Sequence, residues 1–403
     1  MQNAALLWHV SLLVAPERKG IALGAVGLVK IVPILVFSMV SGVMADAWNR
    51  RRLMMFTQVG ASAVAVGLAL LALNGVRALW PLYTLAALGA AIGAFDMPAR
   101  QSLIPMLVPR EHLPNAISLN TIMMQMASVL GPALGGVLIA AAGLAWVYTL
   151  NALSFVFVVV ALLMMRSVRD RPEDAREGNE VSWRAAVEGL RFVFRAPLIR
   201  STMLLDFFAT FFSSATALLP IFAQDVLQLG PSGYGWLYAA PAAGAVLMSG
   251  AMVVLTDRIE RRGIALLWAV ALYGAATVGF GYSTSFWLTF ACLAITGAAD
   301  AVSMVIRGIV RQLETPDRLR GRTVAVTMVF ITGGPQLGEL EAGLVANWLG
   351  APFSVISGGI ACLLATWGVA ATTPQLRRYR ATPIEPMQAV VGVEKWKSRE
   401  VEK

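Results

Sequence analysis

The stretch GVMADAWNRRRLM, residues 42–54, places one acid and three arginines directly after a long apolar run. Asp46 comes first, and Arg50, Arg51 and Arg52 follow it. Arginines at the end of an apolar run are typical of the point where a membrane helix meets the cytoplasm. An acid at a fixed distance before them needs a further explanation, which the rest of the chain supplies.

The composition is that of an integral membrane protein. Of the 403 residues 58% are hydrophobic and 14% are charged, and the mean hydropathy is +0.70, whereas soluble domains carry about 25% charge. The net charge of +9 could suggest nucleic-acid binding, but the basic residues lie between apolar runs rather than on a soluble face. We therefore expect a lipid bilayer, and no nucleic acid, as a partner.

Eleven apolar runs are long enough to cross a bilayer, which takes about 20 helical residues. They are 21–45, 53–72, 79–95, 116–142, 146–165, 202–223, 235–255, 264–280, 286–306, 323–348 and 352–371. Residues 3–15 are also apolar but shorter, and they lack the basic start and cleavage site of a signal peptide. We expect a first helix that is truncated at its N-terminus.

The basic residues are divided unequally between the two sides of the membrane. If the loop after Ala45 is cytoplasmic, 28 of the 32 Lys and Arg residues lie inside and three lie outside, while Lys30 is within a span. This bias predicts a multi-pass membrane protein with a cytoplasmic C-terminus.

A long polar break divides the spans six and six. Residues 166–200 hold eight arginines and six acids, and their second half has the spacing of an amphipathic helix on the inner leaflet, although a plain solvated linker is the alternative. The predicted organisation is a six-helix half at 1–165, this linker, a second half at 201–373 and a disordered cytoplasmic tail at 374–403.

Four motifs of the first half recur in the second, in the same order. Asp46 with Arg50 and Arg51 matches Asp257 with Arg261 and Arg262, GAFD at 93–96 matches GAAD at 297–300, Arg100 before Pro109 matches Arg307 before Pro316, and GPALG at 131–135 matches GPQLG at 334–338. Two parallel halves of six helices, with a substrate site between them, are a known transporter architecture.

The motifs resemble those of the major facilitator superfamily. Gly42, Asp46, Arg50 and Arg51 resemble its motif A, with departures at Ala47 and Asn49, and GPALGG resembles its antiporter motif C. PARQSLIPMLVPREHLPNAISLN and LETPDRLRGRTVAV look like the branch of enterobactin exporters, macrolide efflux pumps and transmembrane secretion effectors. The resemblance implies an all-α fold of 12 transmembrane helices in two pseudo-symmetric halves.

In that superfamily motif A holds the cytoplasmic side closed in the outward-facing state. The resemblance implies a cytoplasmic gate made of Gly42, Asp46, Arg50, Arg51, Arg100, Asp257, Arg261, Arg262 and Arg307. By position, Asp46 is expected to pair with Arg100, and Asp257 with Arg307. The alternative, that the arginines are ordinary positive-inside anchors, leaves the two acids unexplained.

The glycine-proline runs are expected to form a hinge between the halves. They comprise Gly131, Pro132, Gly135, Gly136, Gly334, Pro335 and Gly338. Close packing of small residues, which membrane helices use in any case, is the alternative explanation and is compatible with the first.

Ionisable groups within spans are costly and usually functional. Lys30, with Glu339 or Glu341, is expected to form a pair between the halves that closes the outer side. Asp206 and Asp300 are candidates for proton coupling. The alternatives are a structural bond from Asp300 to Arg307 and a polar cap for Asp206.

These features predict a proton-coupled exporter, acting as a monomer, of a small amphipathic molecule such as a siderophore or a hydrophobic drug. No phosphate-binding loop, metal cluster or nucleophile constellation is visible, so we expect no enzyme activity, cofactor or metal. The alternatives are an importer or facilitator on the same scaffold, or a non-transporting membrane sensor.

Overall fold

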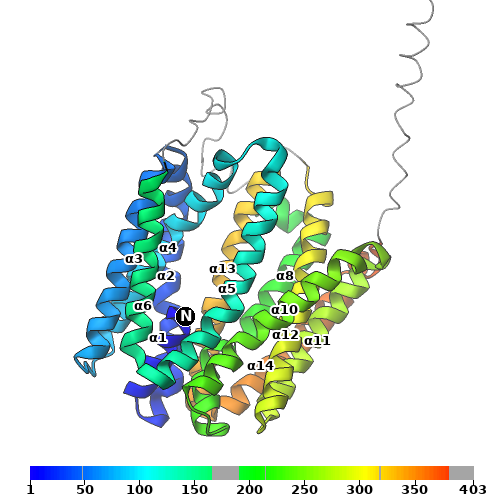
Figure 1. Cartoon of the computed structure of the whole chain (residues 1–403). Coiled ribbons are helices and arrows are strands. Elements are labelled where there is room, and N and C mark those ends of the chain that lie inside the picture. Colours follow the sequence, from blue (N-terminus) through cyan, green and yellow to red (C-terminus); the bar gives the residue numbers. More distant parts are fainter. Residues whose placement is uncertain (48, 166–189, 214, 317–318, 381–403) are drawn as a thin grey trace, which may run out of the picture.

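Long helices make up the described part of the chain, which contains no strand (Figure 1). The structure is a computed structural model that describes residues 1–380 apart from 48, 166–189, 214 and 317–318. Side chains are not described at 38–47, 50, 101–102, 104–106, 110, 114, 215, 257, 320–322, 324–325 and 328–329.

The helices fall into two sets that follow each other in the chain. The first set is α1 (Gln2–Leu13), α2 (Lys19–Ala47), α3 (Arg50–Leu73), α4 (Trp80–Leu107), α5 (Leu113–Ala142) and α6 (Leu144–Met164). The second set is α8 (Pro197–Phe212), α10 (Pro231–Leu255), α11 (Arg262–Tyr282), α12 (Phe286–Glu314), α13 (Arg320–Leu349) and α14 (Ala351–Thr372). After α8 the chain continues through η4 (Ala215–Leu218), α9 (Leu219–Ile221) and the π-helical turn η5 (Phe222–Val226).

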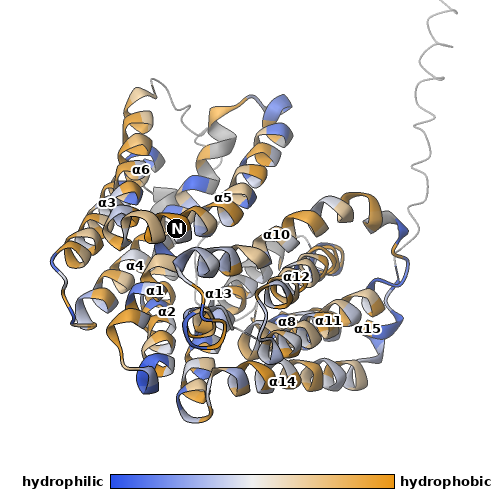
Figure 2. Cartoon of the chain, turned by 60° about the horizontal axis from the view of Figure 1, so that its bottom comes forward, coloured by the Kyte–Doolittle hydropathy of each residue, from blue (hydrophilic) through white to orange (hydrophobic). Residues whose placement is uncertain are grey.

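Ten segments of the described chain are long and apolar enough to cross a membrane. The two remaining positions of the twelve-helix bundle are filled by α1, which has 12 residues, and by α13, whose sequence is interrupted by Arg320, Arg322, Glu339 and Glu341. Hydrophobic residues predominate along most of the helices (Figure 2), and many of them are exposed. Phe157 and Leu247, for example, are 75% and 77% exposed, as expected of a surface that faces lipid.

The two halves repeat their internal packing. In the first half α2 packs on α4, and α3 packs on α4 and α6; in the second half α10 packs on α12, and α11 packs on α12 and α14. Equivalent glycines also end equivalent helices, since Gly143 after α5 and Gly350 after α13 have positive φ angles of 86° and 90°. The expected pair of pseudo-symmetric halves is thus confirmed.

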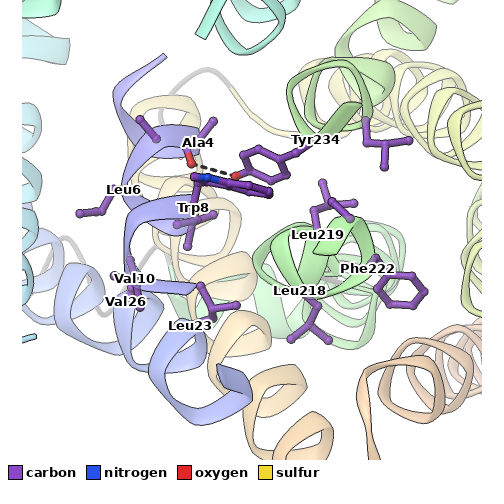
Figure 3. Close-up of a cluster of buried hydrophobic side chains, with 14 of the residues drawn as sticks. Ala4, Leu6, Trp8, Val10, Leu23, Val26, Leu218, Leu219, Phe222 and Tyr234 are labelled. Carbon is purple, nitrogen blue, oxygen red and sulfur yellow. Dashed lines mark hydrogen bonds between the residues drawn. The ribbon is translucent and has the colours of Figure 1, made fainter. Parts of the chain in front are cut away.

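We call one end of the bundle the lower end, after its place in Figure 1; it holds the turns at 14–18, 74–79, 227–230 and 283–285. A buried cluster joins the halves there (Figure 3). The Trp8 and Tyr234 rings lie 4.9 Å apart, and the Tyr234 hydroxyl donates to the Ala4 carbonyl at 2.9 Å. Helix α1 therefore packs directly on α10 of the other half.

The tail differs from the sequence-based expectation at its start. Pro374–Arg378 form a short helix, α15, because Leu376 is fully buried against α11 and α14. The expectation of disorder is wrong for these residues. The rest of the expected tail, 381–403, and most of the expected linker, 166–189, lie outside the described residues.

Candidate transport site between the halves

The halves are joined by two helix crossings. At the first, α2 lies against α13 with its glycines facing the partner backbone. A Cβ placed on Gly24 would lie 3.1 Å from the Cα of Gly343, and one on Gly27 would lie 2.6 Å from the carbonyl oxygen of Gln336. Only glycine allows two backbones to approach this closely.

At the second crossing, α5 lies against α10. A Cβ on Gly235 would lie 2.7 Å from both the Cα of Gly136 and the carbonyl oxygen of Pro132. The second crossing is therefore built from the glycine-proline run predicted to be a hinge.

The other glycines of the two predicted hinges face the helix at the start of their own half. Gly131 and Gly135 lie against Met1 at the start of α1, and Gly334 and Gly338 lie against α8 at Thr210 and Phe211. Pro335 lies inside α13. The two runs thus occupy equivalent places in the repeat, and their role as a hinge stays a prediction.

The α2–α13 crossing carries buried charge. Glu339 is 8% exposed, and its Oε2 atom, which has no hydrogen-bond partner among the described residues, lies next to Gly27. The charges of Lys30 and Glu339 interact electrostatically. Lys30 itself donates to Asn3 Oδ1, and the Asn3 amide donates to the Tyr238 hydroxyl at 2.8 Å.

The predicted ion pair of Lys30 with Glu339 or Glu341 is therefore not formed as a direct contact in the described part of the chain. Asn3 of α1 takes the ammonium group, and Glu341 is only partly buried. The chain Lys30–Asn3–Tyr238 nevertheless links α2 to α10 across the junction of the halves.

A second polar link joins the halves at the lower end. Lys19, with 8% of its side chain exposed, donates to both carboxylate oxygens of Asp225 at 2.9 and 3.0 Å and to Gln224 Oε1 at 2.9 Å. The Gln224 amide donates in turn to Ser11 Oγ at 2.7 Å. The π-helical turn η5 thus presents two adjacent side chains to the junction of α1 and α2.

Nearer the upper end, a buried ion cluster lies within the second half. Arg307 of α12 pairs with Asp206 of α8, and its Nη2 lies 3.4 Å from Asp300. Asp206 and Arg307 line a hollow of about 50 Å³ together with Arg311, Thr202 and Thr327. The structure therefore brings together two proton-coupling candidates and one gate candidate.

In the equivalent cluster of the first half the arginine is more exposed, whereas the acid is less exposed, at 17% for Asp96 against 49% for Asp300. Arg100 pairs with Asp96 at 2.9 Å, and 40% of its side chain is exposed against 13% for Arg307. Asp96 also accepts hydrogen bonds from Thr57 and Gln58. Arg307 thus contacts Asp300, which is the alternative considered from the sequence, and also pairs with Asp206, whereas Arg100 pairs with Asp96.

The predicted partners themselves cannot be placed, because the side chains of Asp46, Arg50 and Asp257 lie outside the described residues, as does the surrounding of Gly42. Arg51 donates to the carbonyl oxygens of Leu162 and Leu163, the last turn of α6, where a cation stabilises a helix end. Arg261 and Arg262 lie at the start of α11. The motif A gate stays a prediction.

Sequence reasoning missed Lys19, Asp225, Asn3 and Tyr238. Lys19 and Asp225 are 206 residues apart, and both lie at the ends of apolar runs, where charged residues are common. A lone asparagine or tyrosine in an apolar run carries no signal of its own. Only the placement of the halves brings these residues together.

The fold and the charged junction define a class: this is a multi-pass membrane transporter made of two similar halves, embedded in a lipid bilayer and acting on a small molecule. The sequence then assigns the family. It matches the family described as transmembrane secretion effectors over residues 1–400, and the chain belongs to that family, a branch of the major facilitators.

Among curated proteins, the chain is similar to the enterobactin exporter EntS of Escherichia coli O1:K1, with 27% identity over 345 residues that cover 86% of this chain and 82% of the relative. EntS of Shigella boydii serotype 18 is 28% identical over 348 residues, with the same coverage.

Solved structures share the fold. A bacterial homologue of the human lysosomal transporter Spinster, inward-facing and unoccupied, has a TM-score of 0.70 at 18% identity and covers 94% of this chain and 96% of its own. A D-xylose-proton symporter has a TM-score of 0.70 at 12% identity, covering 94% and 97%.

Proposed function

We propose that this protein is a proton-coupled exporter of the bacterial inner membrane that moves a small amphipathic molecule by alternating access. One observation carries the proposal. Several side-chain hydrogen bonds and an ion pair join the halves at the lower end, through α1, Lys19 of α2, η5 and the first turns of α10. A bundle whose halves are linked at the lower end is consistent with one end state of a rocking transporter.

The distribution of Lys and Arg assigns the sides in this proposal. The basic loops are at the upper end, so the lower end is the outer side and the C-terminus is cytoplasmic. The conformation is then inward-facing, with the outer side closed by the two crossings and by Lys19 with Asp225. The motif A residues, Asp46 with its arginines and their second copy, would meet when the upper ends approach.

The substrate class rests on the relatives. EntS is named an enterobactin exporter, which favours export of a siderophore or of a hydrophobic drug of similar size. Since each crossing joins one half to the other within a single chain, both walls of the path come from one copy, which favours a monomer.

Proton coupling rests on Glu339. A carboxylate buried at the α2–α13 crossing, with one oxygen unpartnered, changes its surroundings when the helices separate. Such a group can take up a proton in one state and release it in the other. Glu341, Asp206 and Asp300 are further candidates, and of these Asp206 is already paired with Arg307.

The test is transport by the purified chain in vesicles that hold a pH-sensitive dye. Enterobactin and a macrolide are supplied on the side of the basic loops under an imposed proton gradient. We expect proton movement that requires both protein and substrate, and that Glu339→Gln lowers about tenfold while the variant still folds.

Each other outcome counts against a part of the proposal. Substrate movement without protons would refute coupling and leave a facilitator. Uptake from the opposite side only would refute export. If neither compound moves under any gradient, the proposed substrate class is wrong.

A further inference from the structure

The short helix α15 is docked firmly at the upper end of the second half, on its outer edge (Figure 2). The Gly263 amide of α11 donates to the Tyr379 carbonyl at 3.1 Å, and a Cβ on Gly263 would overlap the carbonyl of Leu376. Leu376 is fully buried and packs in one cluster with Leu266 and Val369. The segment after α14 is thus fixed in position.

This docking gathers four arginines around one hollow. Arg261 at the start of α11 and Arg377, Arg378 and Arg380 from the docked segment line a hollow of about 320 Å³, with Ile264 at its apolar side. All four arginines are exposed, and none of them forms an ion pair with a described acid. Four guanidinium groups that repel one another are held together by backbone contacts rather than by carboxylates.

The neighbouring groups leave the hollow positive. Burial raises the pKa of the Tyr379 phenol, and the carboxylate of Glu314 raises it further, although the guanidinium of Arg262 acts in the opposite direction. The phenol is therefore neutral at pH 7. Arg262 lies beside the four arginines of the hollow, and the described acids near these five cations are Glu314 and the exposed Glu260. The positive groups therefore outnumber the negative ones. An anion with several oxygens would relieve the repulsion.

The hollow lies at the level of the lipid headgroups. Trp268 of α11 and Trp367 of α14 are each 73% exposed. Trp268 is six residues and Trp367 five residues from the upper end of its helix. These separations correspond to about 8–9 Å along the helix axis. Exposed tryptophans near helix ends mark the interface of a bilayer. The arginines lie just beyond that level, where lipid phosphates are found.

We propose that Arg261, Arg377, Arg378 and Arg380 form a binding site for the phosphate headgroup of an anionic phospholipid at the outer edge of the α11–α14 pair. Basic pockets between helices at the membrane surface are suited to cardiolipin-like headgroups. The site lies away from the junction of the halves, so it does not depend on the proposed transport function.

The test is native mass spectrometry of the full chain in detergent, titrated separately with cardiolipin, phosphatidylglycerol and phosphatidylcholine. We expect one tight cardiolipin adduct, at least tenfold tighter than phosphatidylcholine, that R377Q/R378Q weakens about tenfold. The matched control is R191Q/R195Q, which removes two exposed arginines outside the hollow and should change binding less than twofold.

A second variant tests whether binding depends on the position of the arginines and not only on their number. Gly263→Val keeps every arginine but displaces α15, so it should also lose the adduct, with thermal unfolding in phosphatidylcholine as the check of folding. The proposal would be overturned if R191Q/R195Q weakened cardiolipin binding as much as R377Q/R378Q, or if the chain showed no preference for anionic lipid. It would also be overturned if folded Gly263→Val kept the adduct. Displacement of cardiolipin by 10 mM inorganic phosphate would show a site for free anions instead.

Discussion

The α5–α10 and α2–α13 crossings occupy equivalent places in the two halves but differ in chemistry. Gly136 ends the first glycine-proline run and faces Gly235; Glu339 stands at the equivalent place of the second run and faces Gly27. Both positions are in close contact with the opposite backbone. One crossing thus has only backbone atoms at its closest contacts, while the other buries an ionisable group.

This difference allows the role of close backbone packing to be considered apart from the role of the buried carboxylate. The α5–α10 crossing brings two backbones together with no ionisable side chain at its closest contacts, so close backbone contact does not in itself require an acid. A buried carboxylate has a desolvation cost that glycine does not have. Glu339 is therefore a residue whose presence calls for a functional explanation.

The largest effect is expected at the two ion clusters, where the halves again differ, because the arginine is buried in one cluster and partly exposed in the other. Arg307→Gln should lower the free energy of unfolding by about 3–5 kcal/mol, because it leaves Asp206 buried without its partner. Arg100→Gln should cost at most about 1 kcal/mol, since that pair is partly exposed. Denaturant unfolding in mild detergent measures both, and equal losses would contradict the comparison.

The next effect concerns the α5–α10 crossing. Gly235→Ala should lower stability by about 1–3 kcal/mol, because its methyl group would lie 2.7 Å from backbone atoms of α5. Gly250→Ala is the matched control on the same helix. It faces open space and should be neutral or stabilising by up to about 1 kcal/mol. Thermal unfolding compares the two, and similar values would argue against a close crossing in the membrane.

A variant that makes the crossings alike sharpens the comparison. Glu339→Gly turns the second run into GPQLGG, so assembly should be retained while substrate-driven proton movement falls about tenfold, or about 1.4 kcal/mol. Gly136→Ala serves as a control for disturbance of a crossing without loss of an acid. Unchanged proton flux in Glu339→Gly would remove this residue from the coupling scheme.

The smallest effect is expected at the lower end. Lys19→Gln should increase labelling of a cysteine introduced at Ser11 by about two- to fivefold, because one charge-assisted link worth about 1 kcal/mol is lost. Asp225→Lys combined with Lys19→Asp should restore the original labelling. If the double variant labels as fast as the single one, Lys19 and Asp225 do not act as a pair.

Much of the fold followed from the sequence, because membrane spans are read from length and hydropathy. The runs 53–72 and 264–280 lie inside α3 and α11, and the motif repeats correctly indicated two similar halves. The start of the tail was misjudged, since the burial of Leu376 depends on α11, a hundred residues earlier in the chain.

The candidate site followed only in part. The charged residues Lys30, Asp206, Asp300 and Glu339 were identifiable because ionisable residues in apolar runs are rare. One contact, from Asp300 to Arg307, was foreseen as an alternative and is present, whereas the pairing of Arg307 with Asp206 was not foreseen.

The sequence by itself therefore indicated a bundle of apolar spans, their repeat in two halves and which charged residues lie within the spans. Only the tertiary structure decided that Lys19 meets Asp225, that Asn3 takes the Lys30 ammonium, and that Glu339 lies on Gly27. The physical reason is that spans are set by local hydropathy, whereas contacts across 200 residues depend on the rotation and depth of whole helices, which local sequence does not encode.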